Sequence, residues 1–273
     1  MQQIFLIAKI TQQKFAESLL DGNVFTRPLA EFGSWNRLKN KDNETLCNNF
    51  RGDLREGAVH TFSNPLENKT IQKFPKEWQN VIKQAIEIDE DVKYFNIYSM
   101  FALKYDKRNR RFKIPDYRMK QFGDTVVIIK DVDEFLKRLK NAIDVKFNEN
   151  IFLVDIMKYK KFNNTEILNP IYVNKEDKSW QCEFRIATAK LDKGNDVSDY
   201  KFNIIKKEIQ HTFNIGDIRD IAISVHIDDF LNLNLPNDLL KINNLKLFKK
   251  LQEETKYNLL QYVSTKQRLI FDI

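Results

Sequence analysis

Short apolar or alternating stretches recur along the 273-residue chain and predict β-strands. The stretches range from an apolar run at the start of the chain to a β-branched run in its middle. The predicted strands cover residues 4–10, 58–62, 93–105, 125–129, 151–159, 180–187, 202–205 and 221–225, with a short extended piece at 24–25.

Other stretches have apolar residues at helical spacing. Thr11 and Asp131 stand at N-cap positions, and Gly22 follows the first helix as its end. In that first helix we expect Phe15 and Leu19 on the buried face. The predicted helices cover residues 11–22, 74–88, 131–143 and 244–263.

Strands and helices do not alternate strictly along the chain. This order favours an α+β fold, with mixed or antiparallel sheets and flanking helices, over a doubly wound sheet. The chain has only 7 Gly and 6 Pro residues, so few linkers are expected. We therefore expect one domain over residues 1–273, with a core at about 1–230 and a helical extension at about 237–273.

Composition excludes several classes of protein. Cys47 and Cys182 lie far apart, and the chain has only 3 His, so neither a metal site nor a disulfide framework is expected. The apolar run near the N-terminus is too short for a signal peptide, and no run of about 18 apolar residues predicts a membrane span. We expect a cytoplasmic protein that does not contact a membrane.

The net charge of +7 favours a polyanionic partner, and much of it gathers at 104–120. Cations beside aromatic rings are typical of surfaces that bind single-stranded nucleic acid. The segment therefore predicts a site for RNA or DNA, and the alternative is a solvated hairpin tip whose rings point inward. The candidate nucleic-acid-binding residues are Lys107, Arg108, Arg110, Arg111 and Lys113, interleaved with Tyr105, Phe112 and Tyr117.

The motifs GxxxxGK[ST], GxGxxG, HExxH and GxSxG are all missing from the sequence. A different pattern, QCEFR at 181–185, places an amide, a carboxylate and a guanidinium at alternate positions of a predicted strand. Gln181, Glu183 and Arg185 would then share one face, with Cys182 and Phe184 on the core face. The polar face would suit a bound ligand, or it would be a solvated face with a Glu–Arg pair of little energetic weight.

A second polar pattern is FRGDLREG at 50–57, in which Arg51 precedes Gly52 and Arg55 lies between Gly52 and Gly57. Glycine permits a turn that approaches a ligand closely, and Arg51 could then bind a phosphate with two hydrogen bonds. The alternative is an ordinary charged loop that enters a strand.

In their order along the chain, several short motifs resemble the AbiGi-type abortive-infection proteins of bacterial phage defence. The similarity spans roughly residues 5–225. The motifs are FAESLLDGNVF at 15–25, PLAEF at 28–32, RGD at 51–53, YFNIYSM at 94–100, FGD at 122–124, EFL at 134–136, QCEFRI at 181–186 and IGDIRDI at 215–221.

The same order resembles an ADP-ribosyltransferase fold. That superfamily presents an Arg or His on an early strand, a Ser or Tyr on a middle strand and a Q/E-x-E pair on a late strand. Here the first strand offers Lys9, the middle one Tyr98 and Ser99, and the late one Gln181 and Glu183.

The resemblance implies a role for each of these residues, with NAD as the substrate. Glu183 would hold the nicotinamide ribose and stabilise its oxocarbenium-like transition state. Gln181 would orient the acceptor. Arg51 would hold the NAD phosphates, and Tyr98, Ser99 and Lys9 would belong to the same NAD site.

We therefore expect an NAD-dependent ADP-ribosyltransferase-like effector of phage defence or of a toxin–antitoxin system. Its acceptor would be a nucleic acid or a protein, and its partner an antitoxin or a phage protein. The alternative is a non-catalytic protein on the same fold that binds or senses nucleic acid, including an antitoxin-like partner.

Overall fold

The computed structural model describes most of the chain. The described residues are 2–32, 58–62, 71–73, 76, 84–89, 92–106, 108, 111–160, 171–192, 203–204, 209–235, 245–262 and 267–272.

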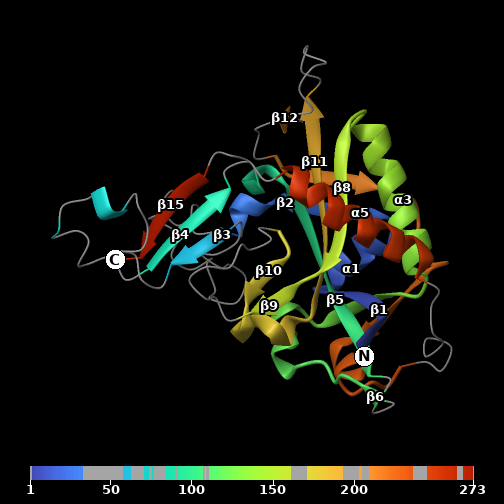
Figure 1. Ribbon diagram of the computed structural model, residues 1–273. Helices are drawn as coiled ribbons and strands as arrows, with labels where there is room; N and C mark the ends of the chain where they lie inside the picture. Colours follow the sequence, from blue (N-terminus) through green and yellow to red (C-terminus); the bar gives the residue numbers. More distant parts are fainter. Residues whose placement is uncertain are drawn as a thin grey trace.

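A ten-stranded sheet forms the centre of the molecule (Figure 1). Its main strands lie in the order β8-β11-β5-β1-β7-β14, and every neighbouring pair is antiparallel. They are β1 (Gln2–Thr11), β5 (Asn96–Asp106), β7 (Thr125–Ile129), β8 (Asn150–Ile156), β11 (Glu183–Asp192) and β14 (Ala222–His226). The shorter strands are β2 (Asn23–Pro28), β6 (Arg111–Phe112), β12 (Asn203–Ile204) and β13 (His211–Asn214).

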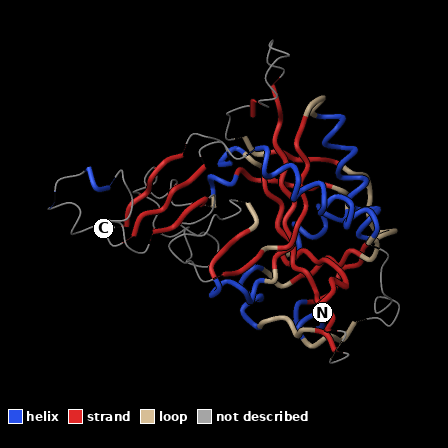
Figure 2. Tube along the Cα trace, viewed as in Figure 1, coloured by secondary structure: helices blue, strands red, loops and turns tan. Residues whose placement is uncertain are grey.

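Three helices cover one face of this sheet (Figure 2): α1 (Gln13–Leu20), α3 (Val132–Lys146) and α5 (Lys246–Tyr262). Their apolar side chains pack with sheet residues such as Ile7, Tyr98 and Phe184 in the largest core cluster. The start of α3 is as predicted, because the Asp131 carboxylate accepts a hydrogen bond of 3.0 Å from the backbone N–H of Glu134.

The opposite face of the sheet carries two smaller apolar clusters. One lies around Phe101, against the 3-10 helix η6 (Tyr117–Phe122) and α4 (Ile227–Leu231). The other includes Tyr172 and residues of η1 (Leu29–Glu31) and η5 (Val92–Tyr94). Polar side chains of β5 and β11 lie between the two clusters.

Two small sheets complete the described fold. The strands β9 (Lys158–Lys160) and β10 (Val173–Lys175) pair in parallel. The second sheet has the order β15-β4-β3 and lies to the left of the main sheet in Figure 1, together with the C-terminus. Its strands are β3 (Ala58–Phe62), β4 (Gln84–Asp89) and β15 (Gln267–Asp272), and the remaining 3-10 helices are η4 (Ile71–Lys73) and η7 (Glu176–Gln181).

The α+β class and the antiparallel sheet are confirmed. The predicted helix at 74–88 is wrong at its end, because Gln84–Asp89 is a strand paired on both sides. Ile86 and Ile88 also fit the alternating pattern of a strand, and pairing with distant segments selects that pattern. One of its partners, β15, lies in the segment predicted as a helical extension.

The first helix also differs from its prediction. Gln12, not Thr11, is the N-cap residue, and it makes no side-chain cap hydrogen bond. Phe15 is 54% exposed, whereas Ala16 and Leu19 face the core. No helix in the described part of the chain is long and apolar enough to cross a membrane.

Backbone hydrogen bonds join the turn after α1 to the loop before β14. Ile215 N donates to Gly22 O, and Ile218 N donates to Leu20 O, both at 2.9 Å. Gly22 has φ +88°, and a Cβ atom built there would lie 2.0 Å from the carbonyl oxygen of Gly216. The DGN part of the motif at 15–25 and the IGD part of the motif at 215–221 therefore have a structural role at this junction.

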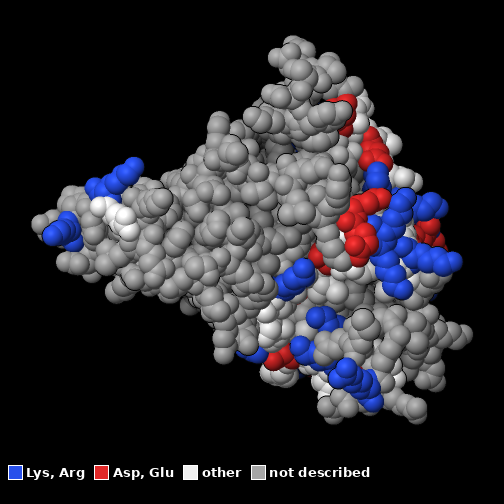
Figure 3. Space-filling view, in the orientation of Figure 1, with Lys and Arg blue, Asp and Glu red and all other residues white. Residues whose placement is uncertain are grey.

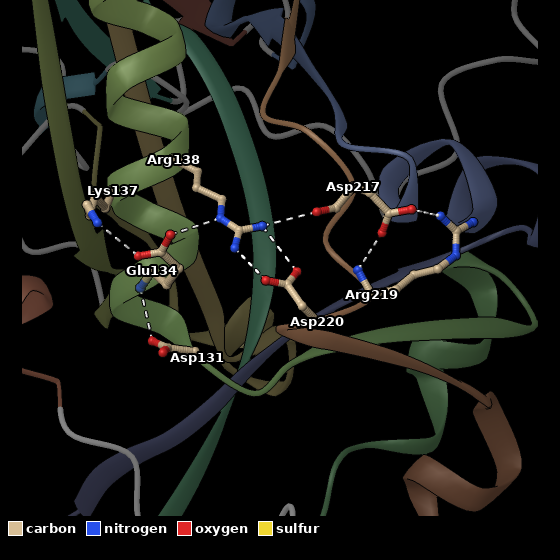
Figure 4. A network of polar contacts seen from close by, with 7 residues as sticks. All are labelled: Asp131, Glu134, Lys137, Arg138, Asp217, Arg219 and Asp220. Atoms are coloured by element: carbon tan, nitrogen blue, oxygen red, sulfur yellow. Dashed lines mark hydrogen bonds and ion pairs between the residues drawn. The ribbon is translucent and has the colours of Figure 1, made fainter.

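Two arginines strengthen the same junction (Figure 4). Arg219 pairs with Asp217 at 2.6 Å and with Asp21 at 2.9 Å. Arg138 of α3 pairs with Asp220 at 2.5 Å, and its hydrogen bonds to Asp220 and Glu134 raise the pKa of the guanidinium. Because these pairs are partly exposed, each contributes little to stability, but together they tie α1, α3 and the 215–221 loop to one another.

We expect Gly22→Ala to lower the free energy of unfolding by about 3 kcal/mol, because the clash with the Gly216 backbone adds to the strain of a positive φ. The matched control is Gly216→Ala, which has φ +77° but nothing within 4 Å of its Cβ position. It should cost about 1–2 kcal/mol. Urea denaturation measures both, and equal losses would contradict the steric explanation.

A second prediction concerns β8, whose Val154 N–H donates to the Thr255 hydroxyl of α5 at 2.8 Å. Thr255→Val keeps the shape but leaves this buried N–H without its acceptor, so we expect a loss of about 2–3 kcal/mol, larger than that of the serine variant. Thr255→Ser keeps the hydroxyl and should lose about 1 kcal/mol for one methyl group. A Val variant as stable as the Ser variant in thermal unfolding would exclude the proposed role of the hydroxyl.

Candidate functional site

A group of buried polar side chains lies on the sheet face opposite the long helices. Its centre is Glu183, the first residue of β11, which is 8% exposed. Alternation along the strand places Glu183 and Arg185 on this face, while Phe184 packs on the helix-covered face.

The carboxylate of Glu183 is held by two side chains. The Ser99 hydroxyl of β5 donates to Glu183 Oε1, and Arg185 Nε donates to the same oxygen at 2.7 Å. The backbone N–H of Glu183 donates to the Tyr159 hydroxyl at 3.0 Å. Contacts from β5, from within β11 itself and from β9 therefore fix the position of this residue.

Arg185 is 3% exposed and lies in the middle of the group. Its Nη1 donates to the carbonyl oxygen of Ile171 at 2.8 Å. In the sheet register it stands opposite Ser99 of β5 on one side and Asp155 of β8 on the other. Asp155, also 3% exposed, accepts a hydrogen bond from the Gln252 side chain of α5.

Two tyrosines extend the buried polar group. Burial raises the pKa of Tyr159, and the nearby Glu183 carboxylate raises it further. Burial also raises the pKa of Tyr172, with a smaller contribution from Asp155. Both hydroxyls therefore stay neutral at physiological pH, and the Tyr159 hydroxyl accepts the backbone N–H of Glu183.

Of the residues predicted to form an NAD site, Ser99 contacts Glu183 directly. Lys9 Nζ donates to the backbone oxygen of Ser99 at 2.7 Å and lies 4.6 Å from the ring centroid of Tyr98. Tyr98 packs in the core cluster on the helix-covered face, so the sheet separates it from Glu183. Burial raises the pKa of Tyr98 as well.

The predicted strand at 180–187 begins later than expected. Gln181 ends η7, and Cys182 has a positive φ of 42°, a left-handed conformation that interrupts the alternation of a strand. Gln181 is therefore not in line with Glu183 and Arg185. Cys182 packs in the cluster around Phe101, not in the cluster that contains Phe184 as predicted.

Glu183 and Arg185 are also more deeply buried than a polar sheet face would be. The sequence predicted a polar face that would suit a bound ligand, or else a solvated face, and the structure shows that this face is not solvated. Apolar clusters on both sides remove the pair from water, and such burial is tolerated because the two charges are paired and hydrogen-bonded.

The structure describes only some of the remaining predicted site residues. Arg51, Lys107 and Arg110 lie outside the described residues, as does the side chain of Arg111 in β6. Arg108 is exposed, and its backbone N–H donates to Asp106 at 2.9 Å.

Lys113 reaches toward the buried group, because its Nζ donates to Cys182 Sγ at 3.4 Å. The neighbouring Lys104 has a lowered pKa, chiefly because of burial. The interleaved rings point in different directions, because Phe112 packs edge-on against Tyr105 at 5.2 Å, whereas Tyr117 is 72% exposed.

The sequence patterns missed Tyr159, Tyr172 and Asp155. A signal for Asp155 existed, since it is a single carboxylate within the apolar strand Asn150–Ile156, and buried carboxylates are rare unless they are paired. The two tyrosines carry no comparable local signal.

A surface groove of about 480 Å³ lies elsewhere, along α3 and β13. Five residues of α3 between Arg138 and Lys146 line it, together with 212–215, and Glu183 is not among the lining residues. Lys or Arg and Asp or Glu side chains alternate along the side of the molecule that carries α3 (Figure 3), so the charges there are mixed. Charge alone therefore does not mark the groove as a binding site.

No family model matches the chain, and neither a curated protein nor a solved structure matches it. Its function is therefore proposed from the geometry of the chain together with the resemblance of its short motifs.

We expect Arg185→Met to lower the free energy of unfolding by about 3–5 kcal/mol, because Glu183 would stay buried without its cation. Adding Glu183→Gln should recover a large part of that loss, since the buried carboxylate is then gone. A double-mutant cycle in guanidinium chloride measures the coupling. Simple addition of the two single losses would contradict a direct ion pair.

Proposed function

We propose that the chain is an NAD-dependent ADP-ribosyltransferase-like effector of phage defence or of a toxin–antitoxin system. Its acceptor would be a nucleic acid or a protein. The observation that carries the proposal is the hydrogen bond between Ser99 of β5 and Glu183 of β11. The resemblance assigns site residues to an early, a middle and a late strand. The corresponding strands here are β1, β5 and β11, which are neighbours in one sheet.

Glu183 would supply the electrostatic part of the reaction. When the bond between ribose C1′ and nicotinamide breaks, its electron pair leaves with nicotinamide and positive charge develops on the ribose. A carboxylate fixed beside that charge favours the transition state over the ground state. The acceptor nucleophile would then form the new bond to C1′.

The other residues would position the reactants. Ser99 and Arg185 hold Oε1 of Glu183, so the carboxylate needs little reorganisation during the reaction. In this proposal Gln181, which precedes Glu183 by two residues, orients the acceptor. The assignment of Arg51 to the NAD phosphates comes from the resemblance alone, since this residue lies outside the described part of the chain.

A second candidate is a non-catalytic protein on the same fold that binds or senses nucleic acid, including an antitoxin-like partner. Burial favours it, because the Glu183 side chain is 10% exposed and that of Arg185 is 4% exposed. A buried, hydrogen-bonded ion pair can be retained for structure alone.

Label transfer from NAD distinguishes the two candidates. The protein is incubated with labelled NAD and with RNA, DNA or cell lysate, and we expect Glu183→Gln to reduce transfer by about 100-fold or more. Glu254→Gln on α5 is the matched control, since Glu254 is half exposed and pairs with Lys250 at 3.8 Å. It should transfer label like the unchanged chain.

Undiminished transfer by Glu183→Gln would remove Glu183 from this role. If the unchanged chain labels no acceptor, the second candidate is favoured instead.

A further inference from the structure

The segment between β6 and the end of η6 presents apolar and aromatic side chains to solvent. Tyr117 is 72% exposed and Ile114 is 70% exposed. Among the strongly exposed rings of the described residues, Tyr117 is more exposed than Phe15 and Phe25. Pro115 and Met119 are buried, so the backbone is anchored while Ile114 and Tyr117 point outward.

Local contacts hold this segment in place before any ligand binds. Asp116 caps η6 by accepting from Arg118 N at 2.9 Å, and it also accepts from Arg118 Nε at 2.8 Å. The Arg118 guanidinium lies 4.6 Å from the ring centroid of Trp180, and Phe122 stacks on the same ring at 6.0 Å. A surface that is already ordered loses less entropy when it binds a partner.

The cations of the segment have different partners. Arg118 pairs with Asp116 at 2.8 Å, and Lys120 pairs with Asp228 at 2.5 Å. These two ion pairs position the segment and reduce its net charge. Lys113 is exposed, and so is Arg108, which lies just before β6, so both cations are accessible to phosphate groups.

The same segment adjoins the buried polar group. Lys113 Nζ contacts Cys182 Sγ at 3.4 Å, and Cys182 directly precedes Glu183. The η7 helix that ends at Gln181 also carries Trp180, the ring against which Arg118 and Phe122 pack.

We propose that Ile114 and Tyr117, with Lys113 and Arg108, form a binding surface for single-stranded nucleic acid. A base would stack on Tyr117 and phosphates would contact the two cations. Tyr117 is exposed and Lys120 Nζ lies 4.6 Å from its ring centroid. An exposed ring beside a cation, in a chain of net charge +7, is complementary to an unpaired strand. The inference deepens the proposed function, since it names the acceptor class, but binding itself requires no NAD.

Fluorescence anisotropy with a labelled single-stranded oligonucleotide tests the surface, with RNA and DNA of the same mixed sequence and the corresponding duplex. We expect the single strands to bind more tightly than the duplex. Tyr117→Ala should weaken single-strand binding by about 5- to 150-fold, which corresponds to the loss of one stacked base. Tyr117→Phe should retain binding, because the ring that stacks is kept.

The control is Phe15→Ala, which removes an exposed ring from α1 and should leave the affinity unchanged. Lys113→Ala and Arg108→Ala should each reduce the slope of log affinity against log salt by about 0.7. The inference is overturned if the oligonucleotides do not bind, or if Tyr117→Ala binds as tightly as the unchanged chain. Exclusive binding of a protein from the host would likewise overturn it.

Two measurements on the unchanged chain, oligonucleotide binding and label transfer, separate this inference from the proposed function. Binding that depends on Tyr117, without any label transfer from NAD, would sustain the surface and reject the transferase.

Discussion

Placing the Arg185 guanidinium in the protein interior costs several kcal/mol unless its charge is paired and its N–H groups are bonded. Two contacts contribute to that requirement. Glu183 supplies the carboxylate from the same strand, and the Ile171 carbonyl supplies an acceptor from the segment before β10. A further carboxylate, Asp155, stands opposite Arg185 in the register of β8. The fold and the candidate site are therefore not independent, because the same cation that positions Glu183 also holds these segments together.

The sequence could identify Glu183 and Ser99 as candidates because both lie within strands that local patterns predict well. Their contact could not be predicted, since it depends on the pairing of β5 with β11, which are 84 residues apart at this point. Tyr159 and Tyr172 were missed for the same reason. The error at Gln181 has a local cause. Cys182 has a left-handed backbone conformation, which a glycine usually marks in a sequence, and a cysteine gives no such indication.

Several motifs in the resemblance to phage-defence proteins have a steric explanation here. Gly22 is needed because the backbone of Gly216 leaves no room for a side chain, and Gly123 meets the backbone of Thr11 in the same way. These glycines are explained by backbone packing, so their presence is no evidence for a reaction. The part of the resemblance that bears on chemistry is therefore smaller, and it consists mainly of the middle and late strands that carry Ser99 and Glu183.

Burial has opposite consequences for the two candidate functions. A carboxylate in a low-dielectric interior interacts strongly with a developing positive charge, which would favour bond cleavage at the ribose. The same interior strengthens its interaction with Arg185, and both Ser99 and Arg185 bind a single oxygen of Glu183. Catalysis thus requires the ribose to reach a carboxylate that is already held by two partners, whereas a structural role requires only that the present contacts persist. The arrangement of the polar group is the same for both functions. They differ in whether a substrate can reach the Glu183 carboxylate between the apolar clusters that flank it.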